Sequence, residues 1–171
     1  MLFLGNNFHF FLKQYLSEVA HFEKFLRVKR SQLPNSGKGL FTTKEIPKGQ
    51  RIVEYKGRLV KWKDVKYKDA TNGYLMYITA NAVIDARPSK TFGRYANDAR
   101  GLSRVNGLKN NSEYVCEGTR CYIDAKRNIC AGEEILVSYG KEYWDLERKT
   151  RREEAKEKRE EKGVNKKSRQ K

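Results

Sequence analysis

A lysine between two glycines is the first feature of this sequence that could serve chemistry. Gly37-Lys38-Gly39 stands in the segment NSGKGLFTT, and glycine lets a backbone approach a ligand closely or make a tight turn. A phosphate-binding loop would need a following Lys-Ser/Thr pair or a third spaced glycine at the start of a helix, and neither is present. The segment therefore excludes the common nucleotide-binding loops and leaves a turn or another kind of ligand loop.

The second feature is a set of tyrosine and amide side chains in two short stretches. RYANDA (94–99) contains Asn97 and Asp98, and EEILVSYG (133–140) contains Tyr139. A tyrosine supplies an apolar ring and one hydroxyl, which suits a channel that holds an alkyl stem and orients the nitrogen atom at its end. Because most of the ten tyrosines are expected in the core or at its rim, residue type alone assigns none of them to a site.

Carboxylates and histidines predict no hydrolytic or metal site. Glu54 and the pair Glu133-Glu134 could suggest hydrolysis by paired carboxylates, but nothing in the sequence places them face to face. We expect the Glu133-Glu134 pair, at the start of a strand, to be solvated or salt-bridged. His9 and His21 fall in one expected helix, at a spacing that suggests neither a metal pair nor a catalytic triad.

The three cysteines predict neither a zinc site nor a disulfide framework. Cys116, Cys121 and Cys130 lack the Cys-x2-Cys spacing of a structural zinc site, and their number is odd. We therefore expect reduced thiols, no bound metal and an intracellular protein. The sequence leaves cytoplasm and nucleus open.

Length and charge indicate one basic domain with extensions. The 171 residues are 38% hydrophobic, enough for one modest core. The formal net charge of +16 predicts a surface that attracts an anionic or acidic partner, without identifying that partner as nucleic acid. The apolar start of the chain has no basic leader and is interrupted by polar residues, so we expect neither a signal peptide nor a membrane span.

Hydrophobic spacing predicts a helix at the start of the chain and strands after it. Over 1–26, apolar residues recur at steps of three and four from Phe8 to Leu26, which predicts an amphipathic helix packed on the domain. A membrane-surface helix and a dimer contact stay open for this segment. Over 27–145, short β-branched and aromatic runs separated by turn residues predict antiparallel strands.

The last segment, 146–171, is almost free of apolar residues. From Glu147 to Lys171 the chain has twelve Lys or Arg against six Asp or Glu. Charged pairs at i,i+4 spacing predict a solvated helix that frays into disorder after Gly163. The alternative for this basic tail is a contact with nucleic acid or with an acidic protein.

The order of four segments resembles the SET domain of protein-lysine methyltransferases. SGKGLFTTKEIPKGQRIVEYKG, GYLMYI, VIDARPSKTFGRYANDA and NICAGEEILVSYGKEYW follow one another over roughly 26–144. The resemblance implies a mostly-β fold of the β-clip type, in which the RYANDA stretch is threaded through a neighbouring loop in a knot-like arrangement. It also implies S-adenosylmethionine as the cofactor.

The resemblance implies roles for ten residues. Tyr139 matches the tyrosine of the family's Glu-Glu-Leu-x-x-Asp-Tyr motif, which implies a catalytic role, and Tyr74 is similar to a second tyrosine of the lysine channel. The residues implied to bind the cofactor are Lys38, Gly39, Arg94, Tyr95, Asn97, Asp98, Tyr143 and Trp144. Among these, Asn97 would hydrogen-bond the cofactor through its amide, and an aromatic ring at 143 or 144 would cover the adenine.

The chemistry of methyl transfer to lysine agrees with these residue types. A lysine ammonium must lose its proton before the amine can attack the methyl group of a sulfonium ion. An aromatic channel removes water from the ammonium group and lowers its pKa, and the positive sulfonium acts in the same direction. The displacement needs positioning and electrostatic support, and no metal.

Several positions depart from the family pattern. Asp98 and Ala99 stand where the family has histidine and serine, and Ser138 replaces the aspartate before the catalytic tyrosine. Val137 occupies the aromatic position that often sets how many methyl groups are added, so that number stays open. No cysteine follows Cys130, so the zinc-binding cluster that many members carry after the domain has no counterpart in this sequence.

These observations predict an S-adenosylmethionine-dependent protein-lysine N-methyltransferase. Its partner would be a protein with a target lysine, and histones or other nucleic-acid-associated proteins are among the candidates. The alternative is a catalytically silent SET-like module that binds peptide or nucleic acid through its basic surface. A small-molecule or DNA methyltransferase is disfavoured, because such enzymes generally have a parallel doubly wound sheet with a glycine-rich first turn.

Overall fold

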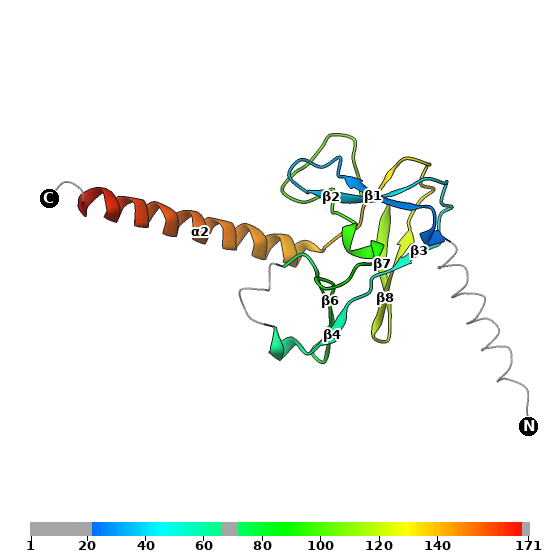
Figure 1. Cartoon of the computed structure of the whole chain (residues 1–171), viewed down its shortest axis with the longest axis horizontal. Coiled ribbons are helices and arrows are strands. Elements are labelled where there is room, and N and C mark those ends of the chain that lie inside the picture. The colour runs from blue at the N-terminus through cyan, green and yellow to red at the C-terminus, as the bar shows by residue number, and fades with distance from the viewer. Residues whose placement is uncertain (1–21, 66–71, 169–171) are drawn as a thin grey trace, which may run out of the picture.

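The computed structural model describes residues 22–65 and 72–168. Within these residues, short antiparallel strands form three small sheets, and one long helix, α2 (Lys141–Ser168), leaves them at one side (Figure 1). Two short 3-10 helices, η1 (Trp62–Asp64) and η3 (Phe92–Tyr95), lie in the connections. The predicted mostly-β fold with a C-terminal helix is confirmed.

Each sheet has three strands. The first has the order β1 (Leu26–Arg30), β2 (Lys38–Thr42) and β9 (Glu134–Ile135). The second has the order β3 (Arg51–Glu54), β8 (Arg120–Ala125) and β7 (Ser112–Glu117). The third has the order β4 (Arg58–Val60), β6 (Ala82–Asp85) and β5 (Leu75–Thr79).

The core joins the first two sheets. Its largest cluster of buried side chains consists of Leu26, Leu40, Ile46, Ile52, Val53, Ala96, Ile123, Ala125, Ile129, Ile135 and Val137. Most are aliphatic and many are β-branched, a composition that fits short, fully buried strands. Because Ala96 and Val137 belong to this cluster, the segments that carry Asn97 and Tyr139 are anchored in the core.

The β7–β8 hairpin corrects the prediction for two of the cysteines. Its tip is a two-residue turn in which Gly118 has φ +61°, a conformation that favours glycine. The register places Cys116 directly opposite Cys121, and the two form a disulfide. The prediction of three reduced cysteines is therefore wrong, and Cys130 remains as an exposed free thiol.

Both ends of the chain differ in part from their predictions. Residues before Phe22 of the predicted N-terminal helix lie outside the described residues, while Leu26 is fully buried in strand β1 and is not helical. At the other end, α2 continues through Ser168, so the predicted end of helical structure after Gly163 is wrong.

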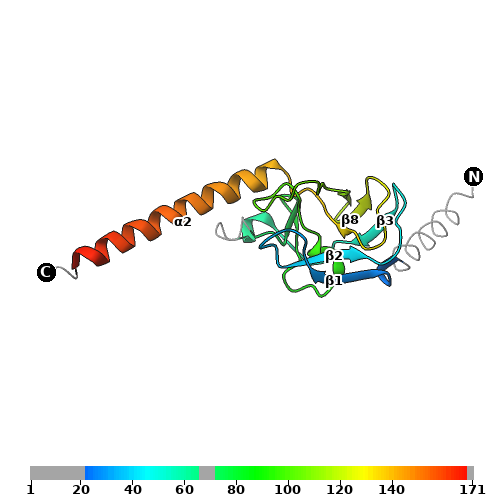
Figure 2. The same ribbon diagram turned by 90° about the horizontal axis from the view of Figure 1, so that it is seen from above.

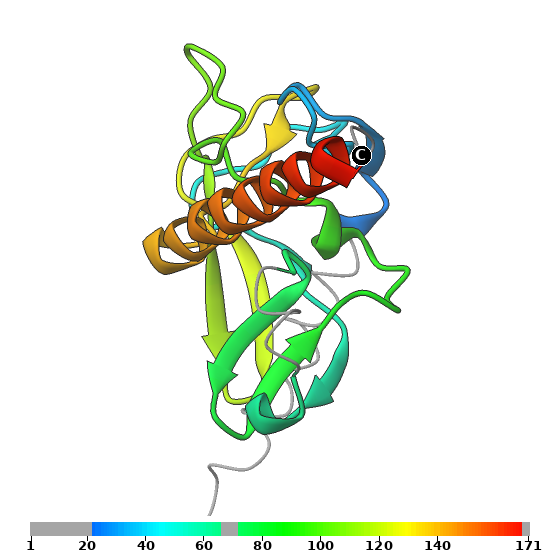
Figure 3. The ribbon, with the colours of Figure 1, turned by 90° about the vertical axis from the view of Figure 1, so that its left-hand side faces the viewer.

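Helix α2 extends well beyond the sheets in two perpendicular views (Figures 1 and 2). Viewed toward the C-terminal end of the helix, the sheets lie behind it (Figure 3). Its residues from 151 to 160 are all exposed. In the part of the chain that the structure describes, no helix has the length and apolar character needed to cross a bilayer.

Candidate active site

Asn97 is the point where three segments of the site meet. Its backbone forms a parallel bridge with Leu136, and its carbonyl accepts a hydrogen bond of 2.9 Å from the Val137 N–H. Its side-chain amide donates to the Lys38 carbonyl at 3.0 Å and to Glu134 Oε1 at 3.1 Å. The Gly37-Lys38-Gly39 loop, the RYANDA stretch and the strand before Tyr139 are thus joined at one residue. The knot-like threading implied for these segments stays a prediction.

Glu134 is a buried carboxylate under the glycine loop. Besides Asn97, Ser31 Oγ and the Gln32 N–H donate to it at 2.7 and 2.8 Å. Gly39 lies so close that a Cβ there would be 2.1 Å from Glu134 Oε1, which explains why glycine is needed at this position. Glu134 is therefore neither solvated nor salt-bridged as predicted, because neutral donors surround it. Glu133 does form the predicted type of contact, an ion pair with Arg127 at 2.8 Å.

Asp98 connects the RYANDA stretch to the start of α2. Its side chain is 5% exposed and accepts four hydrogen bonds. Oδ1 accepts from the Arg100 N–H and from Asn110 Nδ2, both at 2.8 Å. Oδ2 accepts from the Tyr139 N–H at 2.8 Å and from Trp144 Nε1 at 2.7 Å. Both oxygens are thus used by the protein itself. Asp98 thus holds the segment at Tyr139 and the first turn of α2 in place.

Tyr139 is partly buried between the RYANDA stretch and two aromatic rings. Its hydroxyl donates to the Ala96 carbonyl at 2.9 Å. Its ring stacks on Trp144, with centroids 5.8 Å apart and planes 4° apart, and meets Tyr143 edge to face at 5.3 Å. Burial raises the pKa of Tyr139 far above its ordinary value, with smaller contributions from neighbouring phenols, so the hydroxyl stays protonated. Burial likewise raises the pKa of Tyr143 to about 12.

A cavity of about 730 Å³ opens beside Tyr139. Its aromatic lining residues are Tyr55, Trp62, Tyr77, Tyr114, Tyr139 and Tyr143. Leu75, Met76 and Leu146 add aliphatic surface, so the walls are mainly apolar, and Glu142 contributes one carboxylate. Such a cavity can hold an alkyl chain and remove water from the charged group at the end of that chain.

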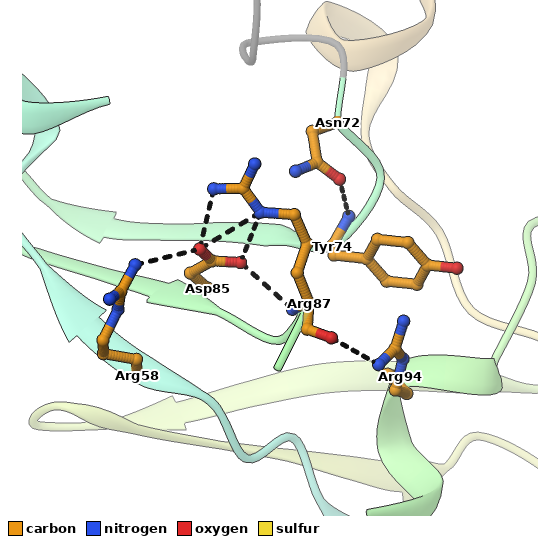
Figure 4. Close-up of polar contacts among 6 residues, drawn as sticks. All are labelled: Arg58, Asn72, Tyr74, Asp85, Arg87 and Arg94. Atoms are coloured by element: carbon orange, nitrogen blue, oxygen red, sulfur yellow. Dashed lines mark hydrogen bonds and ion pairs between the residues drawn. The ribbon is translucent and has the colours of Figure 1, made fainter. Parts of the chain in front are cut away.

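Tyr74 is exposed and does not itself line this cavity, although its neighbours Gly73 and Leu75 do. Its ring lies next to Arg94 (Figure 4). The Arg94 guanidinium is 4.3 Å from the centroid of the Tyr74 ring and donates to the Arg87 and Ser89 carbonyls at 2.6 and 2.7 Å. Burial is the main cause of the raised pKa of Tyr139, and the Tyr74 phenol adds to it. The residue before Tyr74, Gly73, lies against Tyr139, since a Cβ there would be 3.8 Å from the Tyr139 ring, and Arg94 packs on the Tyr74 ring.

Asp85 and Arg87 form an ion pair that stabilises the loop at 87–89, whose carbonyls accept hydrogen bonds from Arg94 (Figure 4). Asp85 is 2% exposed and accepts from Arg87 Nε at 3.0 Å and Nη2 at 2.8 Å, while Arg58 lies at 3.8 Å. The hydrogen bond from Arg87 lowers the pKa of Asp85, against a smaller opposing effect of burial. Because the pKa is lowered in the folded state, the pair stabilises the fold at neutral pH.

Arg87→Gln is expected to lower the free energy of unfolding by about 1 kcal/mol at neutral pH, a modest loss because the arginine is partly exposed and screened. This contribution is present above the unfolded-state pKa of Asp, about 4, and is lost as pH falls through the lower folded-state value. Urea unfolding of both proteins should therefore show a difference at neutral pH that shrinks in acid. A difference that grows in acid would contradict the assignment.

The remaining predicted site residues lie at the edges of this arrangement. Trp144 packs on Gly101, where a Cβ would be 2.5 Å from its ring. Tyr95 packs against the main core cluster, and Val137 is fully buried within it and does not line the cavity. Sequence reasoning missed Tyr55, which directly follows β3 in the first of the four family-like segments, and Tyr114 in β7, whose segment carries no motif. Only the packing of separate sheets reveals them.

The comparisons with known proteins agree with this geometry. Residues 37–140 match the family model described as "SET domain". The chain belongs to the SET-domain family. This match includes the glycine loop, Asn97 and Tyr139, so the predicted resemblance is confirmed.

Curated relatives carry methyltransferase names. N-lysine methyltransferase KMT5A of Xenopus tropicalis is 27% identical over 139 residues, which cover 75% of this chain and 40% of that protein. Histone-lysine N-methyltransferase ASHH3 of Arabidopsis thaliana is 31% identical over 122 residues, 66% of this chain and 32% of that protein. The chain thus spans less than half the length of these relatives.

Solved structures show the same fold. The methyltransferase domain of human PR domain-containing protein 2 is 26% identical, with a TM-score of 0.52, over 73% of this chain and 86% of that one. A humanized mutant of Chaetomium thermophilum Polycomb Repressive Complex 2, bound to the inhibitor GSK126, has a TM-score of 0.56 and 26% identity over 67% of this chain and 15% of that one.

Proposed function

We propose that this chain is an S-adenosylmethionine-dependent protein-lysine N-methyltransferase. The observation that carries the proposal is the position of Tyr139, a partly buried neutral phenol that borders an aromatic cavity and is bound through Asp98 and Ala96 to the RYANDA stretch. Membership of the SET-domain family and the names of the relatives support the same activity.

The cavity walls would hold the side chain of the substrate lysine and favour its neutral form. Tyr55, Tyr114 and Tyr143 surround the alkyl stem and exclude water, which favours the neutral amine over the ammonium ion. Tyr139 cannot act as a base because its pKa is far too high, so its oxygen orients the amine through its lone pairs while its hydrogen is held by Ala96. The proton of the ammonium ion leaves to water before transfer.

The residues around Asn97 fit a cofactor with a polar amino-acid end. Among the described residues, no protein donor reaches Asn97 Oδ1, so this oxygen is available to accept a hydrogen bond from an ammonium group. A Cβ on Gly37 would meet no atom within 4 Å, which leaves open space along the loop. When bound there, S-adenosylmethionine supplies the methyl group and a positive sulfonium. Asn97, the loop at Lys38 and the Trp144 ring would hold it, and Asp98 would support them.

The substrate is proposed to be a protein, with histones as the first candidates. This rests on the relatives named as histone-lysine methyltransferases, and it suggests an intracellular location. The strongly basic surface would also favour a substrate that is associated with an acidic partner.

Calorimetric titration with S-adenosylmethionine tests the cofactor site. We expect wild type to bind and Asn97→Ala to bind at least about 10-fold more weakly, because the variant loses a polar contact to a charged group. Asn106→Ala, at an exposed loop position, serves as the matched control and should bind like wild type. Absence of binding by a folded wild type would overturn the proposal.

A further inference from the structure

Helix α2 divides its charged side chains between two faces. Arg148, Arg152, Lys156 and Arg159 recur at steps of three and four, and we call this the basic face of α2. Glu153, Glu154, Glu157 and Glu160 follow the other side. From Lys141 to Glu160 the helix has eight basic and seven acidic residues, so its charges are separated although their sum is near zero.

Two arginines of the basic face, Arg152 and Arg159, are free to contact an anionic partner. Arg148 pairs with Asp145 at 2.7 Å, and Lys156 lies 3.9 Å from Glu160. Arg152 and Arg159 are exposed, and among the side chains that the structure describes, those of 22–65 and 72–160, neither has a hydrogen-bond or ion-pair partner. Since α2 extends away from the sheets, the described domain does not cover them (Figures 1 and 2).

Salt screening keeps the acidic side from cancelling the basic face. The Debye length at physiological ionic strength is about 8 Å. A helix with side chains is about 10–12 Å across, so charges on directly opposite sides are more than one Debye length apart. Lys156 and Glu160 lie where the two sides meet and are 3.9 Å apart, whereas Arg152 and Arg159 lie farther round the basic face. An anion that approaches the basic face therefore experiences mainly its cations.

We propose that the basic face of α2 binds the phosphate backbone of a nucleic acid. A helix offers one residue of a face per turn, about every 5.4 Å. Duplex DNA carries one charge per about 1.7 Å of its axis, so each cation along the face finds a phosphate within reach whatever the base sequence. The arginine fork is also suited to phosphate oxygens. An acidic protein surface lacks this regular array. The net charge of +16 adds long-range attraction.

Fluorescence anisotropy with a labelled DNA duplex, long enough to span α2, tests the proposal on the full chain without cofactor. Binding should weaken steeply between about 50 and 200 mM salt. Arg152→Gln/Arg159→Gln should weaken binding about 10-fold at the lower salt and reduce the slope of log K against log salt by about 2, one per lost phosphate contact. Circular dichroism should show an unchanged helix content. An RNA duplex in parallel distinguishes the two sources of phosphate backbone.

Two double variants serve as matched controls. Lys90→Gln/Lys126→Gln removes the same charge from exposed positions on the domain and should leave the slope near that of wild type. Glu154→Gln/Glu157→Gln neutralises exposed residues on the acidic side and should not reduce binding. Equal losses in the two basic variants would show that net charge, and not the face, drives binding, and would overturn the proposal. Failure to bind either duplex would overturn it, as would equally tight binding of poly-glutamate, which would indicate an acidic protein partner.

Discussion

Tyr139→Phe is expected to lower the rate of methyl transfer to lysine by at least about 100-fold while the fold and the cofactor site persist. The phenylalanine ring can keep the stack on Trp144 and the edge contact with Tyr143. What is lost is the oxygen that orients the amine, together with one hydrogen bond to the Ala96 carbonyl. Single-turnover transfer, with thermal unfolding and cofactor titration on the same preparations, separates these effects.

Tyr122→Phe is the control for the loss of a tyrosine hydroxyl. Tyr122 is a buried tyrosine in β8 that does not line the cavity. We expect its variant to transfer methyl groups at nearly the wild-type rate. If Tyr139→Phe kept the wild-type rate, or lost rate only in proportion to cofactor binding, the role given to Tyr139 would be wrong.

Asp98→Asn is expected to reduce the free energy of unfolding by about 3 kcal/mol, the second large effect. Each carboxylate oxygen accepts from two N–H donors. An amide replaces one oxygen with an NH2 group, so in either orientation it turns donors toward two buried donors and leaves them unsatisfied. Because two of the four bonds go to Tyr139 and Trp144, cofactor binding should weaken as well.

Urea unfolding measures the loss of stability, and Asp64→Asn supplies the control. Asp64 is an exposed residue of η1, and its conversion to asparagine should change stability by less than about 0.5 kcal/mol. Equal stability of Asp98→Asn and wild type would mean that the four-donor arrangement does not hold the segment together.

The strands could be predicted because their signals are local. Half of the residues in β3 and in β6 are β-branched, and a turn such as the one at Gly118 is encoded by residues next to each other. The Cys116–Cys121 pair could be predicted by the same reasoning, since the cysteines face each other one residue outside a two-residue turn. The number and spacing of the cysteines alone do not reveal this register.

The site could be predicted only in part. Asn97 and Tyr139 belong to motifs whose order along the chain is informative. The roles of Asp98 and Glu134 depend on partners far away in sequence, such as Trp144 for Asp98 and Ser31 for Glu134. For Glu134, residue type suggested a solvated or salt-bridged carboxylate, whereas the packing supplies neutral donors in place of water.

The central claim is tested most directly by identifying the residue that receives a methyl group. Wild type and Tyr139→Phe would be incubated with S-adenosylmethionine and a whole-cell protein extract, and the modified proteins analysed by mass spectrometry. The account predicts new methyl groups on lysine side chains with wild type and at most a trace with Tyr139→Phe. Methyl groups on another residue type, or no new methyl groups while wild type binds the cofactor, would contradict it.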